Sequence, residues 1–346
     1  MEKRISWIDT AKGIVILFVV LGHVSENKYL INYIFSFHIP FFFFLSGFLF
    51  KSEKYNNFTQ FAKKRFKQLI VPYFCFSVIA YLYWIISSFL GTSQGFSIPF
   101  YRPFLSILYS NGMYGWPIYN GALWFLTCLF ITELIFFAVN KFAHKKIMLG
   151  IVIFLFSLIG YFAGSRGLIR YAPWQIDASF SAVVFYSIGF LLKKDGIINT
   201  ILLKYNKIIL LPVLFFLSML LAQINGKADM NINYYGNYFI FYFAAFSGIL
   251  FYIIVSEKIK KSAMLTFLGK NSIIILGMHI ITNILAIKLF LLFSPCNEQL
   301  LRQSPCWSVA LTGVSVLFIL PFIVLINRFV PFVAGKTKNG STLVSK

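Results

Sequence analysis

The sequence predicts an all-α fold, a polytopic bundle of about ten transmembrane helices with both termini in the cytoplasm. Hydrophobic residues make up 59% of the 346 residues, charged residues make up only 12%, and Phe alone occurs 43 times. One soluble core of a chain this long cannot bury so much apolar surface, so we expect lipid to cover it. No polar linker interrupts the pattern, which indicates a single membrane domain over residues 1–335 and a short cytoplasmic tail over residues 336–346.

The expected spans are apolar runs of roughly 20 residues, the length that crosses a bilayer. They cover residues 7–25, 33–50, 70–90, 119–139, 147–164, 178–192, 208–224, 238–255, 272–293 and 307–330. The first run follows a basic start and therefore mimics a signal peptide. Since no small-residue cleavage site follows it, we interpret it as an uncleaved span.

Basic residues in the connecting segments orient the bundle. With the N-terminus inside, 24 of the 31 Lys and Arg residues fall in expected cytoplasmic segments, six fall in outer loops, and Lys288 lies within a span. Cytoplasmic loops are enriched in Lys and Arg, so this bias places both termini inside and makes the number of spans even. The net charge of +21 would suggest nucleic acid for a soluble protein. Here topology accounts for it, and we expect no nucleic-acid partner.

The first span carries three ionisable residues, Asp9, Lys12 and His23. Such groups are costly inside a membrane and are usually functional. Lys12 and His23 are eleven residues apart, which places them on one face of a helix about 16 Å apart, and Asp9 lies one turn from Lys12. A plainer interpretation is a salt bridge between Asp9 and Lys12 at the cytoplasmic interface, with Lys12 snorkelling and His23 simply hydrogen-bonded.

Histidines in later spans extend this set. His38 precedes Pro40 near the outer end of the second span, at a depth similar to that of His23, which suggests a shared polar site. Alternatively, His38 only caps the backbone that Pro40 leaves without a donor. His279 in the ninth span and Glu133 in the fourth are further candidates, and the plainer role for His279 is a structural hydrogen bond between spans.

A basic amphipathic segment, KSEKYNNFTQFAKKRFKQLIVPY, precedes the third span and contains Lys64, Arg65 and Lys67. It suits contact with anionic lipid headgroups, and it equally suits the 3′-phosphate and diphosphate of coenzyme A at the cytoplasmic mouth of the bundle. Cys296 and Cys306 share one outer loop, where they would form either a disulfide or two free thiols.

The segment RISWIDTAKGIVILFVVLGH resembles the opening signature of the membrane acyltransferase 3 family. In that family a basic residue and the catalytic His are separated by ten residues, as Lys12 and His23 are. The segment SFHIPFFFFLSGFLF, which contains His38 and Ser46, is similar to the second-span pattern F-H-x-P-x-F-F-x-x-S-G. The Trp-Ile-Asp-x-x-Lys-Gly form is nearest to the fucose 4-O-acetylase-like subgroup.

Two later segments carry the resemblance over nearly the whole chain. LWFLTCLFITE, which contains Trp124, is similar to the fourth-span motif, and LGKNSIIILGMH, which ends in His279, resembles the late motif. The chain departs from the family at two places. Gln68 stands where many members have the second Arg of an R-x-x-R pair, so Lys64 or Lys67 would have to substitute. Glu133 comes four residues after the position at which some members carry a Glu.

The resemblance implies a bacterial inner-membrane O-acyltransferase that moves an acetyl group from cytoplasmic acetyl-CoA to a sugar hydroxyl. The acceptor would be a surface polysaccharide, such as O-antigen, or its lipid-linked precursor, and acetyl-CoA would be a substrate, with no bound cofactor or metal. His23 would act as general base, and Asp9 would orient Lys12. The implied acyl-CoA contacts are Lys12, Lys64, Arg65 and Lys67. Residues for the acceptor site or for structure are His38, Ser46, Trp124, Glu133 and His279.

Other mechanisms and classes remain open at this point. His23 could instead carry the acyl group covalently as a nucleophile. A transporter or flippase for a lipid-linked sugar also needs many spans and polar stripes, but it would move its substrate without turning over acetyl-CoA. A different membrane acyltransferase type that relies on one intramembrane His would need His279 and could dispense with His23.

Overall fold

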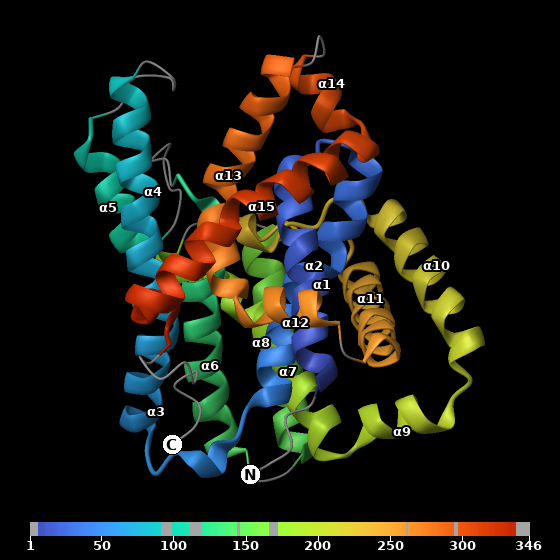
Figure 1. Cartoon of the computed structure of the whole chain (residues 1–346). Coiled ribbons are helices and arrows are strands. Elements are labelled where there is room, and N and C mark those ends of the chain that lie inside the picture. Colours follow the sequence, from blue (N-terminus) through green and yellow to red (C-terminus); the bar gives the residue numbers. More distant parts are fainter. Residues whose placement is uncertain are drawn as a thin grey trace.

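The computed structural model of the chain describes residues 6–90, 99–110, 119–143, 146–165, 172–260, 262–293 and 297–336. Within these ranges the fold is helical and contains no strand, apart from one isolated bridge between Asp229 and Tyr234. Figure 1 shows the helices gathered into one bundle, as the all-α prediction requires.

The long helices match the expected spans closely. They are α1 (Ser6–Val24), α2 (Lys28–Leu49), α4 (Val71–Phe89), α6 (Trp124–Phe142), α7 (Lys146–Ser165), α8 (Ile176–Lys194), α10 (Lys207–Asn225), α11 (Tyr238–Ile259), α13 (Ser272–Phe293) and α15 (Pro305–Phe329). Of the described residues, nine helical segments are long and apolar enough to cross a membrane, and α7 has a shorter apolar stretch over Lys146–Phe162. The chain is therefore a multi-pass membrane protein.

Short helices join or cap these spans. They are η1 (Ser52–Lys54), α3 (Phe58–Arg65), the π-helical turn η2 (Phe66–Ile70), α5 (Tyr101–Tyr109), η4 (Gly121–Leu123), η5 (Pro173–Gln175), α9 (Ile197–Lys204), η6 (Met230–Ile232), α12 (Ala263–Lys270), α14 (Glu298–Gln303) and η7 (Pro331–Ala334). In the loop expected to hold the two cysteines, Cys306 is exposed at the start of α15, and Cys296 lies outside the described residues.

The basic segment before the third span is helical and continuous with that span. Asn57 caps the start of α3, where its side chain accepts a hydrogen bond from the backbone N–H of Gln60 at 2.8 Å. The helix then runs through η2 into α4, giving one helical segment over Phe58–Phe89. The π-helical turn ends two residues before Pro72, which has no backbone N–H, and such turns accommodate interruptions within helices. The basic residues thus stand on the first turns of a span.

The segment between the eighth and ninth expected spans is not a simple loop, because Ala263–Lys270 form α12 and this helix packs on α1. A Cβ placed on Gly269 would lie 1.9 Å from the carbonyl oxygen of Asp9, and one on Gly13 would lie 2.0 Å from the carbonyl oxygen of Leu265. The two backbones therefore touch, as small residues allow in membrane bundles. Figure 1 shows α12 lying across α1.

Helices α1, α2 and α6 form the centre of the bundle, and α10 lies at its edge. The apolar windows of these three helices are each 72% buried, whereas that of α10 is 17% buried. α2 packs against α8 through Gly47, which lies against the backbone of Tyr186. The exposed side chains of α10 are mostly apolar, which fits contact with lipid.

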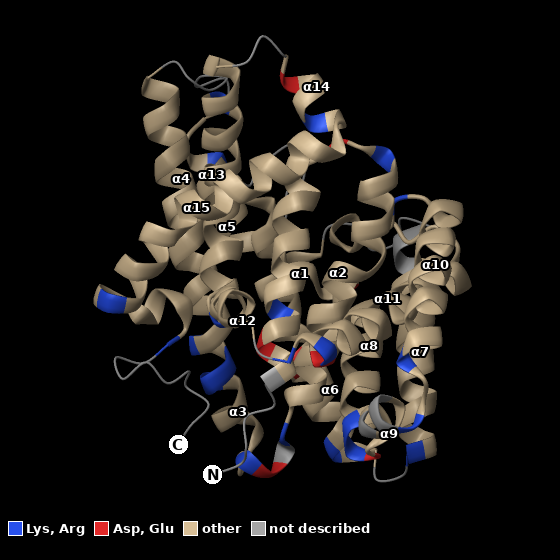
Figure 2. Ribbon diagram, turned by 45° about the vertical axis from the view of Figure 1, so that its right-hand side comes forward, with Lys and Arg blue, Asp and Glu red and all other residues tan. Residues whose placement is uncertain are grey.

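Charge separates the two ends of the bundle. Figure 2 shows Lys and Arg gathered around α3 and α9, at the end where α1 begins. This distribution agrees with the predicted cytoplasmic end, because basic residues gather on that side of a membrane. At the C-terminal edge of the described chain, Nζ of Lys336 donates to the side-chain oxygens of Asn271 and Asn327, both at 2.8 Å. Residues 331–336 are therefore docked against the bundle.

Candidate active site

A cavity of about 290 Å³ opens at the end of α1, away from the basic end of the bundle. Its walls come from α1, α2, the start of α6, the connection between α10 and α11, α13 and α14. Three side chains singled out in the sequence line it: His23, His38 and Trp124. The prediction of a polar site shared by the first two spans is consistent with this arrangement.

The third histidine lies beside this cavity. The imidazole rings of His23 and His279 have centroids 5.0 Å apart. The ring of Phe35 packs near both His23 and His38, with centroid distances of 6.3 Å and 4.9 Å. Helices that are distant in sequence, α1, α2 and α13, thus bring three imidazoles to one place.

Backbone carbonyl groups select the tautomers of two of these histidines. Nδ1 of His38 lies 2.6 Å from the carbonyl oxygen of Ile34, and Nδ1 of His279 lies 2.9 Å from that of Leu276. A carbonyl oxygen only accepts, so each Nδ1 is the donor, and each neutral ring keeps a lone pair on Nε2. Nε2 of His279 is buried and has no hydrogen-bond partner among the described residues. The ring next to His23 therefore offers a free acceptor.

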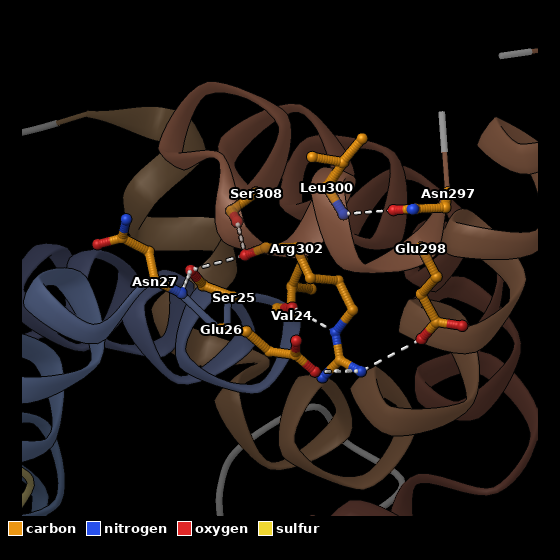
Figure 3. Close-up of polar contacts among 9 residues, drawn as sticks. All are labelled: Val24, Ser25, Glu26, Asn27, Asn297, Glu298, Leu300, Arg302 and Ser308. Carbon is orange, nitrogen blue, oxygen red and sulfur yellow. Dashed lines mark hydrogen bonds and ion pairs between the residues drawn. The ribbon is translucent and has the colours of Figure 1, made fainter. Parts of the chain in front are cut away.

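Arg302 fixes the end of α1 next to His23 (Figure 3). Its Nε donates to the carbonyl oxygen of Val24 at 3.0 Å, and its backbone oxygen accepts from the N–H of Glu26 at 2.7 Å. Its guanidinium also pairs with the carboxylates of Glu26 and Glu298 at 2.9 and 3.2 Å. The last carbonyl groups of a helix lack partners within the helix, so this side chain both satisfies one of them and anchors the turn that carries the histidine.

The basic end of the bundle holds a buried ion pair. Nε and Nη2 of Arg65 donate to the two carboxylate oxygens of Glu133, and Nη1 donates to Oε1 of Gln68 at 2.6 Å. The Glu133 side chain is 1% exposed and that of Arg65 is 20% exposed. The sequence-based expectation aimed Arg65 at the acyl donor, whereas the structure gives this guanidinium a bidentate internal partner. Gln68, which departs from the family pattern, completes that network.

The neighbouring lysines have more freedom. The ammonium of Lys64 lies 5.3 Å from the centre of the Tyr55 ring, and Lys67 is exposed. Asp9 is buried and Lys12 is half-buried on α1. From Lys12 to His23 the helix rises about 16 Å. The predicted residues therefore fall into a group at the cavity and a group toward the basic end, with α1 between them.

Ser46 does not reach the cavity. It is half-buried on α2, eight residues after His38, which is about 12 Å further along the helix. Among the described residues no group of His, Cys, Asp and Glu side chains has an arrangement suited to a metal ion.

Sequence reasoning missed the polar groups at the mouth of the cavity. Lys227, Asp229 and Asn231, on the connection between α10 and α11, line it together with Arg302. Lys227 and Arg302 are two of the six Lys and Arg residues that the sequence assigns to outer loops. The available signal was the density of polar residues in the segment NGKADMNIN, which is unusual for a short connection between two apolar spans.

Comparison with known proteins identifies the family of the chain. Residues 5–325 match the family model Acyl_transf_3, described as an acyltransferase domain, and the chain therefore belongs to this family. No curated protein matches it, and no solved structure matches it. Together with the apolar helices, membership in this family defines the chain as a membrane acyltransferase.

Proposed function

We propose that the chain moves an acetyl group from cytoplasmic acetyl-CoA to a sugar hydroxyl of a surface polysaccharide or of its lipid-linked precursor, in a bacterial inner membrane. The observation that carries this proposal is the position of His23. This imidazole lines a cavity at one end of a span whose other end lies toward the basic side of the bundle. A donor that enters from the basic side and an acceptor that enters from the opposite side would meet there.

The chemistry assigned to His23 is general-base catalysis. Its ring takes the proton of the acceptor hydroxyl while the hydroxyl oxygen bonds to the thioester carbonyl carbon. The carbon–sulfur bond then breaks, and the coenzyme A thiolate leaves and receives the proton from the imidazolium. His279 is assigned to orient this ring. The two ring centroids lie 5.0 Å apart, and Nε2 of His279, which has no hydrogen-bond partner among the described residues, would accept a hydrogen from the other His23 nitrogen. Covalent transfer through His23 would use the same geometry.

The donor is assigned to the basic end of the bundle. Acetyl-CoA carries its phosphates at the end of a long flexible arm, far from the thioester. Lys12 lies in the first half of α1, Lys64 in α3 and Lys67 in η2, the elements at that end, and cationic side chains favour phosphate groups. We assign Arg65 to holding Glu133 and α6 in place beside this donor site.

Transfer of labelled acetyl groups tests the proposal. Purified protein in lipid nanodiscs is incubated with acetyl-CoA labelled in the acetyl group and with two fractions from host cells, the aqueous surface polysaccharide and the organic extract of lipid-linked glycans. Label in either fraction that disappears with His23→Ala supports the proposal. Movement of a lipid-linked glycan across the bilayer of proteoliposomes without acetyl-CoA turnover would instead indicate a flippase. Failure to label any fraction would overturn the proposal.

A further inference from the structure

We propose that the mouth of the cavity is the acceptor subsite and that it takes one neutral pyranose ring at a time. This inference rests on the proposed function, because it names the acceptor that presents its hydroxyl to His23. The subsite consists of the rim, defined as Lys227, Asp229 and Asn231, and of Trp124 on α6. All four side chains line the same cavity as His23.

The rim is held rigidly before any ligand binds. The backbone N–H and carbonyl of Asp229 pair with those of Tyr234 at 2.6 and 3.0 Å, which closes the segment into a tight loop. Asn233 within this loop adopts a left-handed conformation and donates through Nδ2 to the buried carboxylate of Asp177 at 2.8 Å. A preorganised rim loses little conformational entropy on binding, so its polar groups can be used for selectivity.

The side chains of the rim are also held in place. Oδ1 of Asp229 accepts from the backbone N–H of Asn231 at 3.1 Å, and Oδ1 of Asn231 accepts from Nε2 of Gln175 at 3.1 Å. The ammonium of Lys227 lies 4.4 Å from the centre of the Phe35 ring. The rim therefore presents a carboxylate, an amide and an ammonium in fixed positions, which is the kind of surface that hydroxyl groups of a sugar hydrogen-bond.

Charge balance at the cavity favours a neutral ring. Nζ of Lys227 lies 3.0 Å from the Asp229 carboxylate. Arg302 is paired with Glu26 and Glu298. Each Lys, Arg and Asp side chain in the described lining thus has a partner of opposite charge within the protein. A uronate or a phosphorylated sugar would enter without an unpaired cation to receive it, and an unpaired charge in a partly enclosed site is costly.

The size of the cavity favours a single ring. Its volume of about 290 Å³ lies at the lower limit of pockets that hold drug-sized ligands, about 300–1,000 Å³. Trp124 is 7% exposed and lines the wall, so it supplies an apolar surface for the C–H face of the ring. The remainder of a polymer or of a lipid carrier would stay outside the mouth.

Paired acceptors test the charge argument. Acetyl transfer is measured to methyl glycosides of neutral hexoses and to the matching methyl uronates, in which only the C6 group differs, with acetyl-CoA as donor. Wild-type protein is expected to use the neutral glycosides at least about tenfold more efficiently, because the carboxylate meets no unpaired cation. Equal use of both would overturn the inference.

Variants of the rim then separate this inference from the proposed function. Asp229→Asn leaves Lys227 unpaired, so the KM for neutral acceptors should rise about tenfold and the preference should shift toward the uronates, while the KM for acetyl-CoA stays unchanged. Lys227→Met removes the cation itself, so this variant should not shift the preference toward uronates. The matched control is Glu257→Gln, which breaks the 2.7 Å ion pair with Lys207 at the opposite ends of α10 and α11.

The outcomes are distinguishable. Transfer to host glycans with an unchanged acceptor KM in Asp229→Asn would refute the subsite and leave the proposed function standing. The subsite would also be refuted if the protein acetylates host glycans but neutral methyl glycosides neither accept acetyl groups nor compete with those glycans. Absence of transfer to every acceptor would refute the proposed function itself. Comparison of label in the organic extract with label in the aqueous polysaccharide identifies whether the ring comes from a lipid-linked precursor or from the polymer.

Discussion

The Arg65–Glu133 ion pair makes a quantitative prediction about stability. Glu133→Leu and Arg65→Met each leave the other member of the pair charged and without its counterpart, at a place where the Glu133 side chain is 1% exposed. Removal of one member of a buried ion pair typically costs about 3–5 kcal/mol, because the remaining charge is desolvated without compensation. Replacement of both by apolar residues, as in Arg65→Met with Glu133→Leu, should restore most of this loss.

Thermal unfolding of the purified variants in one detergent measures this effect. Each single variant should unfold about 10 °C below the wild type, and the double variant should lie much closer to the wild type. The double-mutant cycle isolates the interaction between the two side chains from their separate effects. Losses that simply add in the double variant would refute a direct pairing of these residues.

The same double variant also tests the assignment of the acyl donor. If Arg65 serves mainly to hold Glu133 and α6, the double variant should keep its KM for acetyl-CoA once stability is restored. A rise of tenfold or more in that KM, with stability recovered, would show that the guanidinium contacts the donor directly. Lys67→Met, which removes an exposed cation beside it, provides the comparison.

Three further predictions follow from other contacts. Burial lowers the pKa of Lys336 from 10.5 to about 8, so the unfolded chain binds more protons than the folded chain between these pH values. The thermal stability of the wild type relative to Lys336→Met should therefore rise from pH 8 to pH 10.5, and a pH-independent difference would contradict this. Gly269→Ala places a Cβ 1.9 Å from the carbonyl oxygen of Asp9 and should destabilise the contact of α12 with α1. The control Gly313→Ala, whose Cβ would have no atom within 4 Å, should be neutral or slightly stabilising, and equal melting temperatures of the two variants would contradict the packing. Arg302→Met removes the hydrogen bond to the carbonyl oxygen of Val24 and so frees the end of α1. The kcat should fall about tenfold or more while the KM for acetyl-CoA changes little, and an unaltered kcat would show that Arg302 does not position His23.

Much of the fold follows from hydrophobic run length alone. The ten longest helices lie where the apolar runs predict them, because a bilayer demands a minimum apolar length whatever the tertiary packing. The structure of the segments between spans was harder to predict from the sequence. Residues 263–270 form a short helix, and only the structure shows that this helix lies on α1 through the contact of Gly269 with the backbone of Asp9. Charge patterning could not reveal this contact, because it reports the side of the membrane and not the packing partner.

Part of the candidate site was predictable, because position along an apolar span gives the depth of a residue in the membrane. The depths of His23 and His38 along their spans predicted a common polar region, and the cavity contains both. The pairing of Glu133 with Arg65 was not predictable from spacing, because a contact between two helices depends on their relative rotation and register. The rim escaped notice because short polar loops carry no periodic signal, although they are common positions for binding residues.

The most direct test of the account is the acetyl content of the surface polysaccharide, measured by NMR in host cells that carry the wild type or His23→Ala at equal membrane abundance. We predict loss of the O-acetyl signals with His23→Ala and an otherwise intact polysaccharide. Retained acetylation would contradict the role of His23, and a shortened or missing polysaccharide would indicate a transporter instead of an acyltransferase acting on this glycan.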